Sequence, residues 1–283
     1  MTTVGGTGEG RLIELIKPYL SKQAGRDDAA VLDPVDAYEV LSTDMAVEGV
    51  HFDLAWMSAE DAGWRALALA LGDLAAKGAT PEWALTSLAV PRSWNLDDFV
   101  GLFRGIRLLA SRHLMAIEGG DLSAINGPAV LTLTVGGHAD SKPLPRSAAQ
   151  PGWAIAVTGP LGASAVALRQ RRVLRPEPLI EQGLRLNELG LCCGDVSDGL
   201  VRELEKFAQM SGIGFTVDAS KVPIAEGATL DDALTSGEEV ALVCVGPEAQ
   251  VRGAGLEPFG VMTDRGFNIN GIQGTRRGYD HFA

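Results

Sequence analysis

The sequence predicts two domains of mixed helix and strand, of the α/β or α+β class. The chain has 283 residues, which is enough for roughly two domains of ~150 residues each. Hydrophobic residues make up 46% of it, so a sizeable core can be buried. Strand-like and helix-like segments alternate as far as His138, which is typical of a sheet covered by helices.

Composition and charge exclude several classes of protein. The net charge of −12 argues against a nucleic-acid surface, which needs a basic patch. No run approaches ~20 apolar residues, so no membrane span is predicted, and residues 1–10 lack a signal-peptide pattern. Cys192, Cys193 and Cys244 have no zinc-ligand spacing, and we expect them to be buried thiols in a reducing cytoplasm.

The first domain is expected over residues 1–140. Its predicted strands are 38–42, 83–90 and 129–135, and its predicted helices are 11–20, 58–78 and 95–113. Ser58 is a suitable N-cap for the second of these helices, which ends near Gly78.

The second domain is expected over residues 141–283. The Pro- and Ser-containing segment 141–152 predicts the boundary. Strands are predicted at 155–157 and 240–245, and helices at 163–172 and 201–210.

The densest group of polar residues follows the strand 38–42. Ser42, Thr43 and Asp44 are followed within ten residues by a second carboxylate and by His51. Oxygen groups of this kind are the ligands of Mg²⁺, which also retains waters and substrate phosphates. The alternative is a turn capped by local side-chain hydrogen bonds.

Asp73 is the only charge in the Ala/Leu-rich run 66–76. A carboxylate in such a run is costly to bury unless it is paired or bound to a metal. The alternative is a place on the solvent-facing side of the helix.

Three further stretches carry acidic residues. Asp28 is half of an acidic pair before an apolar strand, and the segment 118–121 joins two glycines to Asp121. Glycines let a backbone approach a ligand closely. Asp195 and Asp198 precede the helix 201–210. A solvated turn remains an alternative for the pair at Asp28, and an N-cap remains one for Asp198.

Seven motifs occur in one order along the chain. They are residues 27–32, 42–52, 72–79, 119–121, 175–178, 197–200 and 278–282. In this order they resemble the thiamine-monophosphate kinases, a family of the aminoimidazole ribonucleotide synthetase-like superfamily. The resemblance covers nearly the whole chain.

The resemblance implies an α+β, two-domain synthetase-like fold. Its N-terminal mixed sheet domain would bind ATP and Mg²⁺ and would form a homodimer through its sheet. A C-terminal α/β domain would complete the active site. The implied reaction is direct, in-line transfer of the γ-phosphoryl group of ATP to thiamine monophosphate, with no phosphoenzyme, in the cytoplasm.

The resemblance also implies roles for individual residues. Several Mg²⁺ ions would be held by Asp28, Ser42, Thr43, Asp44, Asp73, Asp121, Asp195 and Asp198. Within this set, Asp44, Asp73, Asp121 and Asp195 would be catalytic. ATP would contact Gly120, Asp121, Arg146 and Ser197, and the acceptor would contact His51, Glu238 and the position of Arg276.

The chemistry of these residues suits the implied reaction. Phosphoryl transfer depends mainly on positioning and on charge neutralisation. Carboxylates do not bind phosphate directly, but bound Mg²⁺ ions reverse the local sign of charge. An acidic site can therefore handle two phosphate-bearing reactants.

Four departures from the family pattern affect mainly the acceptor side. Arg26 replaces a glycine, Leu122 replaces a hydroxyl residue, 236–241 differs from Gly-Gly-Glu-Asp-Tyr-Glu, and Arg276 replaces an aromatic residue. A cationic thiazolium favours an aromatic face, so weak use of thiamine monophosphate is expected unless a neighbour such as Tyr279 supplies that face.

These departures leave other functions open. One is a divergent kinase with another small phosphorylated acceptor. The others are an ATP-dependent ligase of the same superfamily and a non-enzymatic nucleotide-binding protein.

Overall fold

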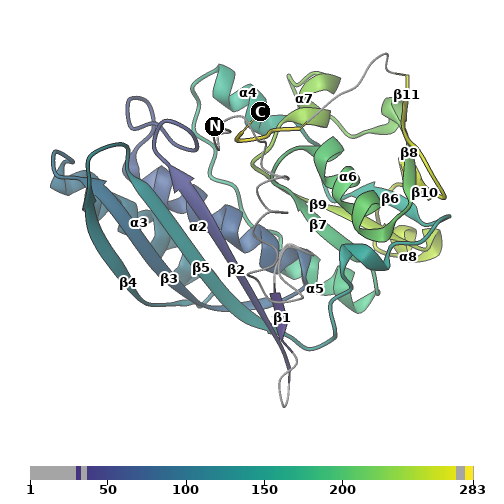
Figure 1. Cartoon of the computed structure of the whole chain (residues 1–283), viewed down its shortest axis with the longest axis horizontal. Coiled ribbons are helices and arrows are strands. Elements are labelled where there is room, and N and C mark those ends of the chain that lie inside the picture. Colours follow the sequence, from purple (N-terminus) through teal and green to yellow (C-terminus); the bar gives the residue numbers. More distant parts are fainter. Residues whose placement is uncertain (1–29, 33–36, 272–277, 283) are drawn as a thin grey trace, which may run out of the picture.

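Two β-sheets lie side by side, and the chain completes the first before it enters the second (Figure 1). The structure is a computed structural model, and it describes residues 30–32, 37–271 and 278–282. The helix predicted over 11–20 and the residues Arg26, Asp28 and Arg276 lie outside the described residues.

The first sheet has five strands in the order β1-β2-β5-β3-β4. Their bounds are β1 Ala30–Leu32, β2 Tyr38–Val47, β3 Thr80–Pro91, β4 Ala116–Ile125 and β5 Val130–Ala139. β4 pairs with β3 in parallel, and the other neighbours are antiparallel. Side chains along β2, β3 and β5 alternate between buried and more exposed positions, as expected when one face is covered.

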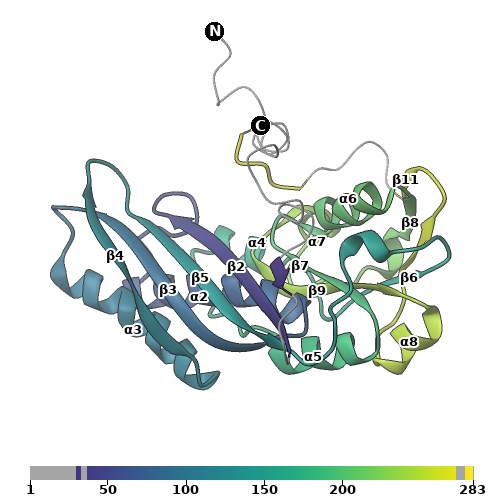
Figure 2. The same ribbon diagram turned by 60° about the horizontal axis from the view of Figure 1, so that its bottom comes forward.

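Two helices cover that face (Figure 2). They are α2 (Ala59–Ala76) and α3 (Leu96–Arg112), capped by Ser58 and Asn95. A Cβ at Gly105 would lie 1.9 Å from the Glu60 carbonyl oxygen, so glycine is required for this close helix packing. Met45 and Leu85 point to the opposite face, where they are 57% and 40% exposed.

The second sheet has six strands in the order β11-β8-β10-β6-β9-β7. The strands are β6 Ala154–Val157, β7 Cys192–Val196, β8 Gly214–Asp218, β9 Glu239–Gly246, β10 Gly260–Thr263 and β11 Phe267–Asn270. The α-helices of this half are α4 Ala163–Arg169, α5 Ile180–Glu188, α6 Leu200–Ser211, α7 Leu230–Thr235 and α8 Glu248–Gly253. Short 3₁₀ helices cover Arg146–Ala148 and Ala219–Lys221.

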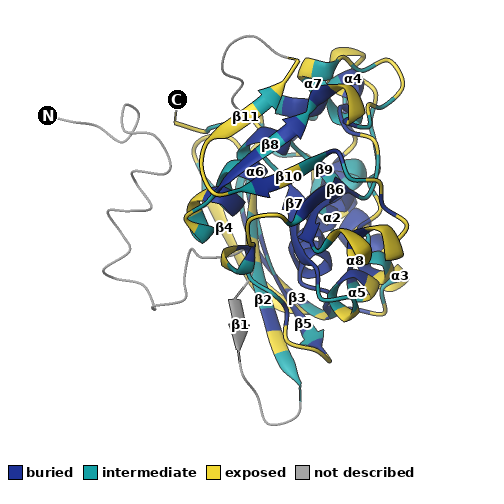
Figure 3. Cartoon of the chain, turned by 90° about the vertical axis from the view of Figure 1, so that its right-hand side faces the viewer, coloured by how far each residue is buried: buried dark blue, intermediate teal, exposed yellow. Residues whose placement is uncertain are grey.

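One hydrophobic cluster spans both halves, with α2 at its centre (Figure 3), and a second cluster lies wholly within the second half. Leu67 and Leu71 of α2 belong to the same buried cluster as Leu242 and Cys244 of β9. The predicted boundary at 141–152 falls between the last strand of the first sheet and the first strand of the second. Because the core crosses it, α2 fixes the position of each half against the other.

Most predicted elements are confirmed, and one needs correction. The strand before Asp44 does not end at Ser42 but continues to Val47, because β2 pairs with β5 over its whole length. The structure also has elements that were not predicted, namely β4, which contains Gly119 and Gly120, and β7, β8, β10, β11, α5, α7 and α8. No helix of the described residues has both the length and the apolar character of a membrane span.

Candidate active site

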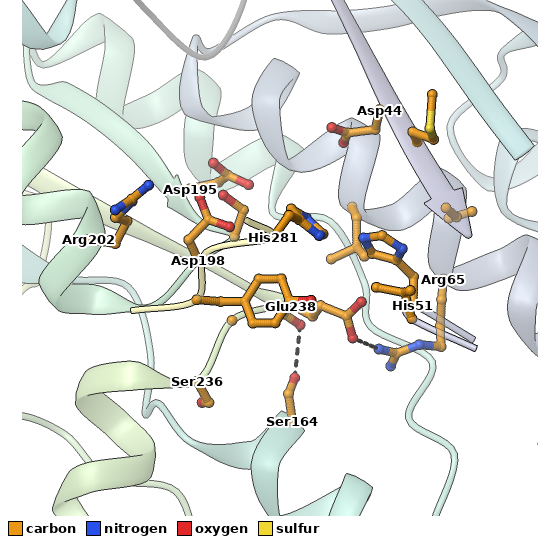
Figure 4. A pocket seen from close by; sticks show the side chains of 18 of the residues that line it. Asp44, His51, Arg65, Ser164, Asp195, Asp198, Arg202, Ser236, Glu238 and His281 are labelled. Carbon is orange, nitrogen blue, oxygen red and sulfur yellow. Dashed lines mark hydrogen bonds and ion pairs between the residues drawn. The ribbon is translucent and has the colours of Figure 1, made fainter. Parts of the chain in front are cut away.

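A cleft of about 1580 Å³ lies between the two halves of the molecule. One side is formed by β2, the loop after it and α2, and the other by β7, α6 and the segment before β9 (Figure 4). Tyr279 and His281, near the end of the chain, also line it.

Three carboxylates face this cleft, and two of them are buried while Asp44 is half-buried. Asp44 lies in the middle of β2, Asp73 on α2 is 9% exposed, and Asp195 at the end of β7 is 5% exposed. The Ser42 hydroxyl donates a hydrogen bond to Asp73. A Cβ at Gly72 would lie 3.3 Å from the Asp195 carboxylate, so this glycine lets β7 bring its acid against α2. The solvent-exposed alternative for Asp73 is wrong.

Burial and mutual repulsion raise the pKa values of these acids. Burial, with further repulsion from Asp195 and Asp198, raises the pKa of Asp44 to about 7. Burial, Asp195 and Asp44 raise the pKa of Asp73 well above its usual range. Burial and the neighbouring Glu203 raise the pKa of Asp195 to about 6. Each is costly to ionise here without an added cation.

The donor set is suited to a hard cation. Carboxylates and a hydroxyl are the oxygen ligands that Mg²⁺ takes, usually one or two carboxylates with waters and substrate phosphates. Among the described residues, no three His, Cys, Asp or Glu side chains converge closely enough to hold a metal by themselves. The arrangement therefore fits ions that bind jointly to protein and phosphate.

Two cations lie behind the carboxylates on the α6 side of the cleft. The Lys206 ammonium lies 3.0 Å from the Asp198 carboxylate and 3.7 Å from that of Glu203. Arg146 binds the other oxygen of Glu203, and both side chains are almost fully buried. Gly199, not Asp198, is the N-cap of α6 and makes no side-chain cap bond, so the capping role considered for Asp198 is wrong.

Aromatic rings and one carboxylate form the far end of the cleft (Figure 4). The rings of His51 and His281 are 5.2 Å apart, and Tyr279 meets His281 edge-on at 4.7 Å. Burial and the neighbouring His281 lower the pKa of His51, whose Nδ1 accepts the Val47 N–H at 3.0 Å. Glu238 adopts a left-handed backbone, with φ 57°.

Asp121 and Gly120 do not line the cleft of this chain. Asp44 and Gly120 lie in one row of residues that runs across the sheet. In this row Asp44 of β2 is opposite Leu133 of β5, Leu133 is opposite Thr86 of β3, and Thr86 is opposite Gly120 of β4. Three strand spacings separate the ends of this row by about 14 Å. Since Asp121 is the next residue, it faces the other side of the sheet.

Other predicted residues have mixed outcomes. Thr43, Arg146 and Ser197 line the cleft, although the Thr43 hydroxyl lies 3.1 Å from that of Thr134. Residues 239–241 do not line it, contrary to the expectation that they form acceptor-side surface. The Glu239 carboxylate instead accepts N–H groups of Gly162 and Ser164, each at 3.0 Å.

Two cleft residues escaped the sequence analysis. Arg65 lies one residue outside the apolar run that made Asp73 stand out, and is buried on the same helix. A sequence window that began one residue earlier would have included Arg65 as a second charge beside the apolar run. Lys206 lies on an amphipathic helix among other charged residues, so its sequence context does not distinguish it.

Three comparisons place the chain among known proteins. Residues 26–139 match the family model "AIR synthase related protein, N-terminal domain". The chain is 35% identical to "Thiamine-monophosphate kinase" of Rhodopirellula baltica, over 78% of this chain and 75% of that protein. It is 33% identical to the protein of the same name from Salmonella typhimurium, over 91% of each.

Solved structures agree with the sequence comparisons. The structure "AaThiL complexed with AMPPCP and TMP" has a TM-score of 0.88 and 25% identity, and covers 99% of each chain. "Thiamine-monophosphate kinase from Stenotrophomonas maltophilia K279a" has a TM-score of 0.73 and 30% identity, over 93% of this chain and 96% of that one. Escherichia coli HypE, a hydrogenase maturation protein, shares the fold at 17% identity.

The two sheets and the acidic cleft between them define an AIR synthase-related protein. Within this class, the chain shares about a third or more of its aligned residues with two thiamine-monophosphate kinases over most of its length. The chain belongs to the thiamine-monophosphate kinase family.

Proposed function

We propose that this chain carries out its family's reaction, formation of thiamine diphosphate from thiamine monophosphate and ATP, in the cleft between its two sheets. The observation that carries the proposal is the meeting of Asp44, Asp73 and Asp195 beside the ring-lined end of the same cleft. One end concentrates negative charge for cations. The other presents a carboxylate and aromatic rings to an organic cation.

Mg²⁺ is the cation that the acidic end fits. Asp44, Asp73, Asp195, Asp198 and the Ser42 hydroxyl would hold it, together with phosphate oxygens and, outside the described residues, Asp28. Bound there, Mg²⁺ supplies charge neutralisation for phosphates brought close together. The protein holds its acids in fixed positions and encloses them, and the acceptor phosphate is already an ionised nucleophile.

The remaining residues have roles in binding. Arg146 and Ser197 would contact ATP, and His51 and Glu238 would contact the thiamine portion of the acceptor. Tyr279 supplies an aromatic face in the cleft, the role that sequence reasoning assigned to the position of Arg276. With 239–241 turned inward, the expectation of weak acceptor use rests on Arg276 alone. The Michaelis constant of Arg276→Trp, compared with the parent, tests that expectation.

The direct test is incubation with ATP, Mg²⁺ and thiamine monophosphate, followed by mass detection of thiamine diphosphate and of ADP. We expect both products in equal amounts, and neither after metal chelation. Other small phosphomonoesters in parallel reactions test the divergent-kinase alternative. Product from one of them and none from thiamine monophosphate would overturn the proposed acceptor.

A homodimer through the first sheets accounts for the position of Asp121. This residue lies on the face that the described helices leave open, with the exposed side chains of Met45 and Leu85 nearby on the same face. A second copy packed on that face would cover both apolar groups and would bring its own Asp121 close to another chain. Light scattering should therefore give twice 29.7 kDa, and Leu85→Asp should give the monomer mass.

A further inference from the structure

Arg65 joins the two halves of the molecule at the acceptor end of the cleft (Figure 4). It lies on α2, next to Trp64, and its side chain is 11% exposed. Nη2 donates to the Glu238 carboxylate at 2.6 Å, and Nη1 donates to the Leu174 carbonyl at 3.2 Å. Its planar guanidinium therefore binds two separate segments of the second half.

The backbone of Glu238, like its side chain, is fixed by hydrogen bonds. Its N–H donates to the Ser197 carbonyl at 2.8 Å, and its carbonyl accepts the Ser164 hydroxyl at 2.8 Å. The left-handed φ of 57° is costly for a residue with a Cβ, and such strain is typical of functional sites. A Cβ at the preceding Gly237 would lie 2.1 Å from the Ser197 oxygen, so the approach to Glu238 requires glycine there.

We propose that Arg65 is a positioning residue for the acceptor: it fixes the Glu238 carboxylate so that one oxygen faces the thiamine portion of thiamine monophosphate. The inference rests on the proposed function. The ion pair engages Oε2 and leaves Oε1 for the ligand, and the Glu238 side chain is 32% exposed at the cleft wall. If Arg65 acts on the acceptor through Glu238, its loss should weaken acceptor binding and spare ATP binding.

Arg65 also favours the ionised form of Glu238, whose pKa is raised overall. Burial raises the pKa of Glu238, the Arg65 guanidinium opposes that rise, Glu239 adds to it and His281 opposes it. His51 and Tyr279 are further titratable groups that line the same cleft. Without the guanidinium, Glu238 takes up a proton at higher pH and can no longer attract a cation.

The experiment is steady-state kinetics with varied thiamine monophosphate at saturating ATP and Mg²⁺, and then with the two substrates exchanged. Arg65→Met should raise the Michaelis constant for thiamine monophosphate about tenfold or more, the scale of one lost hydrogen bond to a charged group. The constant for ATP should stay within about twofold, and Arg65→Lys should recover part of the loss. In Arg65→Met, the acidic limb of kcat/KM for the acceptor should move to higher pH.

A double variant separates positioning from general damage. If Arg65 acts through Glu238, then Arg65→Met combined with Glu238→Gln should be no worse than Glu238→Gln alone. Arg175→Met is the matched control. Arg175 lies beside Leu174, contacts Trp64 on the same helix and pairs with Glu60 and Asp61, away from Glu238.

Several outcomes would overturn the inference. One is a Michaelis constant for thiamine monophosphate that is unchanged in Arg65→Met, and another is an equal rise in the constant for ATP. A double variant whose effect equals the product of the two single effects would also contradict the inference, as would an Arg175→Met variant that raises the acceptor constant as much as Arg65→Met does. If Arg65→Met does not fold, Arg65→Lys decides, because it keeps the buried charge: a parental acceptor constant contradicts positioning, and a selective rise supports it. A parent protein that makes no thiamine diphosphate would instead overturn the proposed function.

Discussion

The two sides of the cleft treat their carboxylates differently. On the side of the first sheet, the half-buried Asp44 and the buried Asp73 form no ion pair with any residue that the structure describes. Across the cleft, Asp195 at the end of β7 is likewise unpaired among the described residues, but three other acids have cationic partners: Asp198 with Lys206, Glu203 with Arg146, and Glu238 with Arg65.

The difference separates two kinds of binding. Acids without a partner carry a charge that is costly until a cation arrives, so their side of the cleft is ready for metal. Acids with a partner are already neutralised and held in one geometry. Their side is therefore suited to orienting substrates. Removing a charge should change the unfolding free energy in opposite directions on the two sides.

The largest expected effect is on turnover. Asp44→Asn or Asp73→Asn should lower kcat by about a hundredfold or more, because each removes a charge that would hold metal against the phosphates. The measurement is the rate of thiamine diphosphate formation at saturating Mg²⁺. Asp97→Asn, on the exposed first turn of α3, is the control and should keep the parental rate. Near-normal turnover in both cleft variants would contradict the metal assignment.

A smaller effect concerns stability on the opposite side. Arg146→Met leaves Glu203 buried without its closest cation and should cost about 3 kcal/mol of unfolding free energy. This value is at the low end for a broken buried pair because Lys206 remains 3.7 Å from Glu203. Asp73→Asn should have the opposite sign and stabilise the metal-free protein at pH 8. Urea denaturation measures both.

Arg252→Met is the control for that comparison. Arg252 pairs with Glu248 and Glu257 in solvent, where ion pairs contribute little, so its loss should change the unfolding free energy far less than Arg146→Met does. If Arg146→Met cost no more than Arg252→Met, the distinction between the two sides of the cleft would fail.

A further effect is the pH dependence of metal-free stability. Asp44, with its pKa raised to about 7, stays protonated in the native state while an unfolded aspartate ionises near pH 4. The native state then binds more protons, so unfolding free energy falls as pH rises from about 4 to 7, by at most about 1.4 kcal/mol per pH unit for one such group.

Thermal unfolding at several pH values, with and without Mg²⁺, measures this dependence. The Tm of the metal-free protein should fall between pH 5 and pH 8, and Mg²⁺ should restore it at pH 8 by binding the ionised acids. A Tm that rose with pH and did not change on addition of Mg²⁺ would contradict the description of Asp44 and Asp73 as acids without a cationic partner.

The sequence predicted the acidic half of the cleft better than the paired half. Asp73 stood out because a lone charge in an Ala/Leu run needs a partner, and the helix that carries it is buried on nearly all sides. Arg65, Lys206 and Glu203 gain their importance only from contacts between distant segments, which local patterns do not encode.

Strand register explains the other limits of sequence reasoning. Asp44 was expected after the end of its strand, but pairing with β5, almost a hundred residues away in sequence, extends β2 past it. The glycines before Asp121 gave no sign of a strand, whereas pairing with β3 makes them part of an edge strand. That pairing also decides which face Asp121 occupies, and a shift of one residue would reverse it.

Helix α2 fixes the distance between the two ends of the cleft. Arg65, which pairs with Glu238, and Asp73, at the acidic end, are eight residues apart on one helix, an axial distance of about 12 Å. Under the proposed function, an acceptor would have to present its cationic ring and its phosphate at a separation that this fixed length allows. Inserting one residue between them would turn one end by about 100° relative to the other, so the selectivity of the cleft for molecular length is built into a helix whose own residues are mostly core.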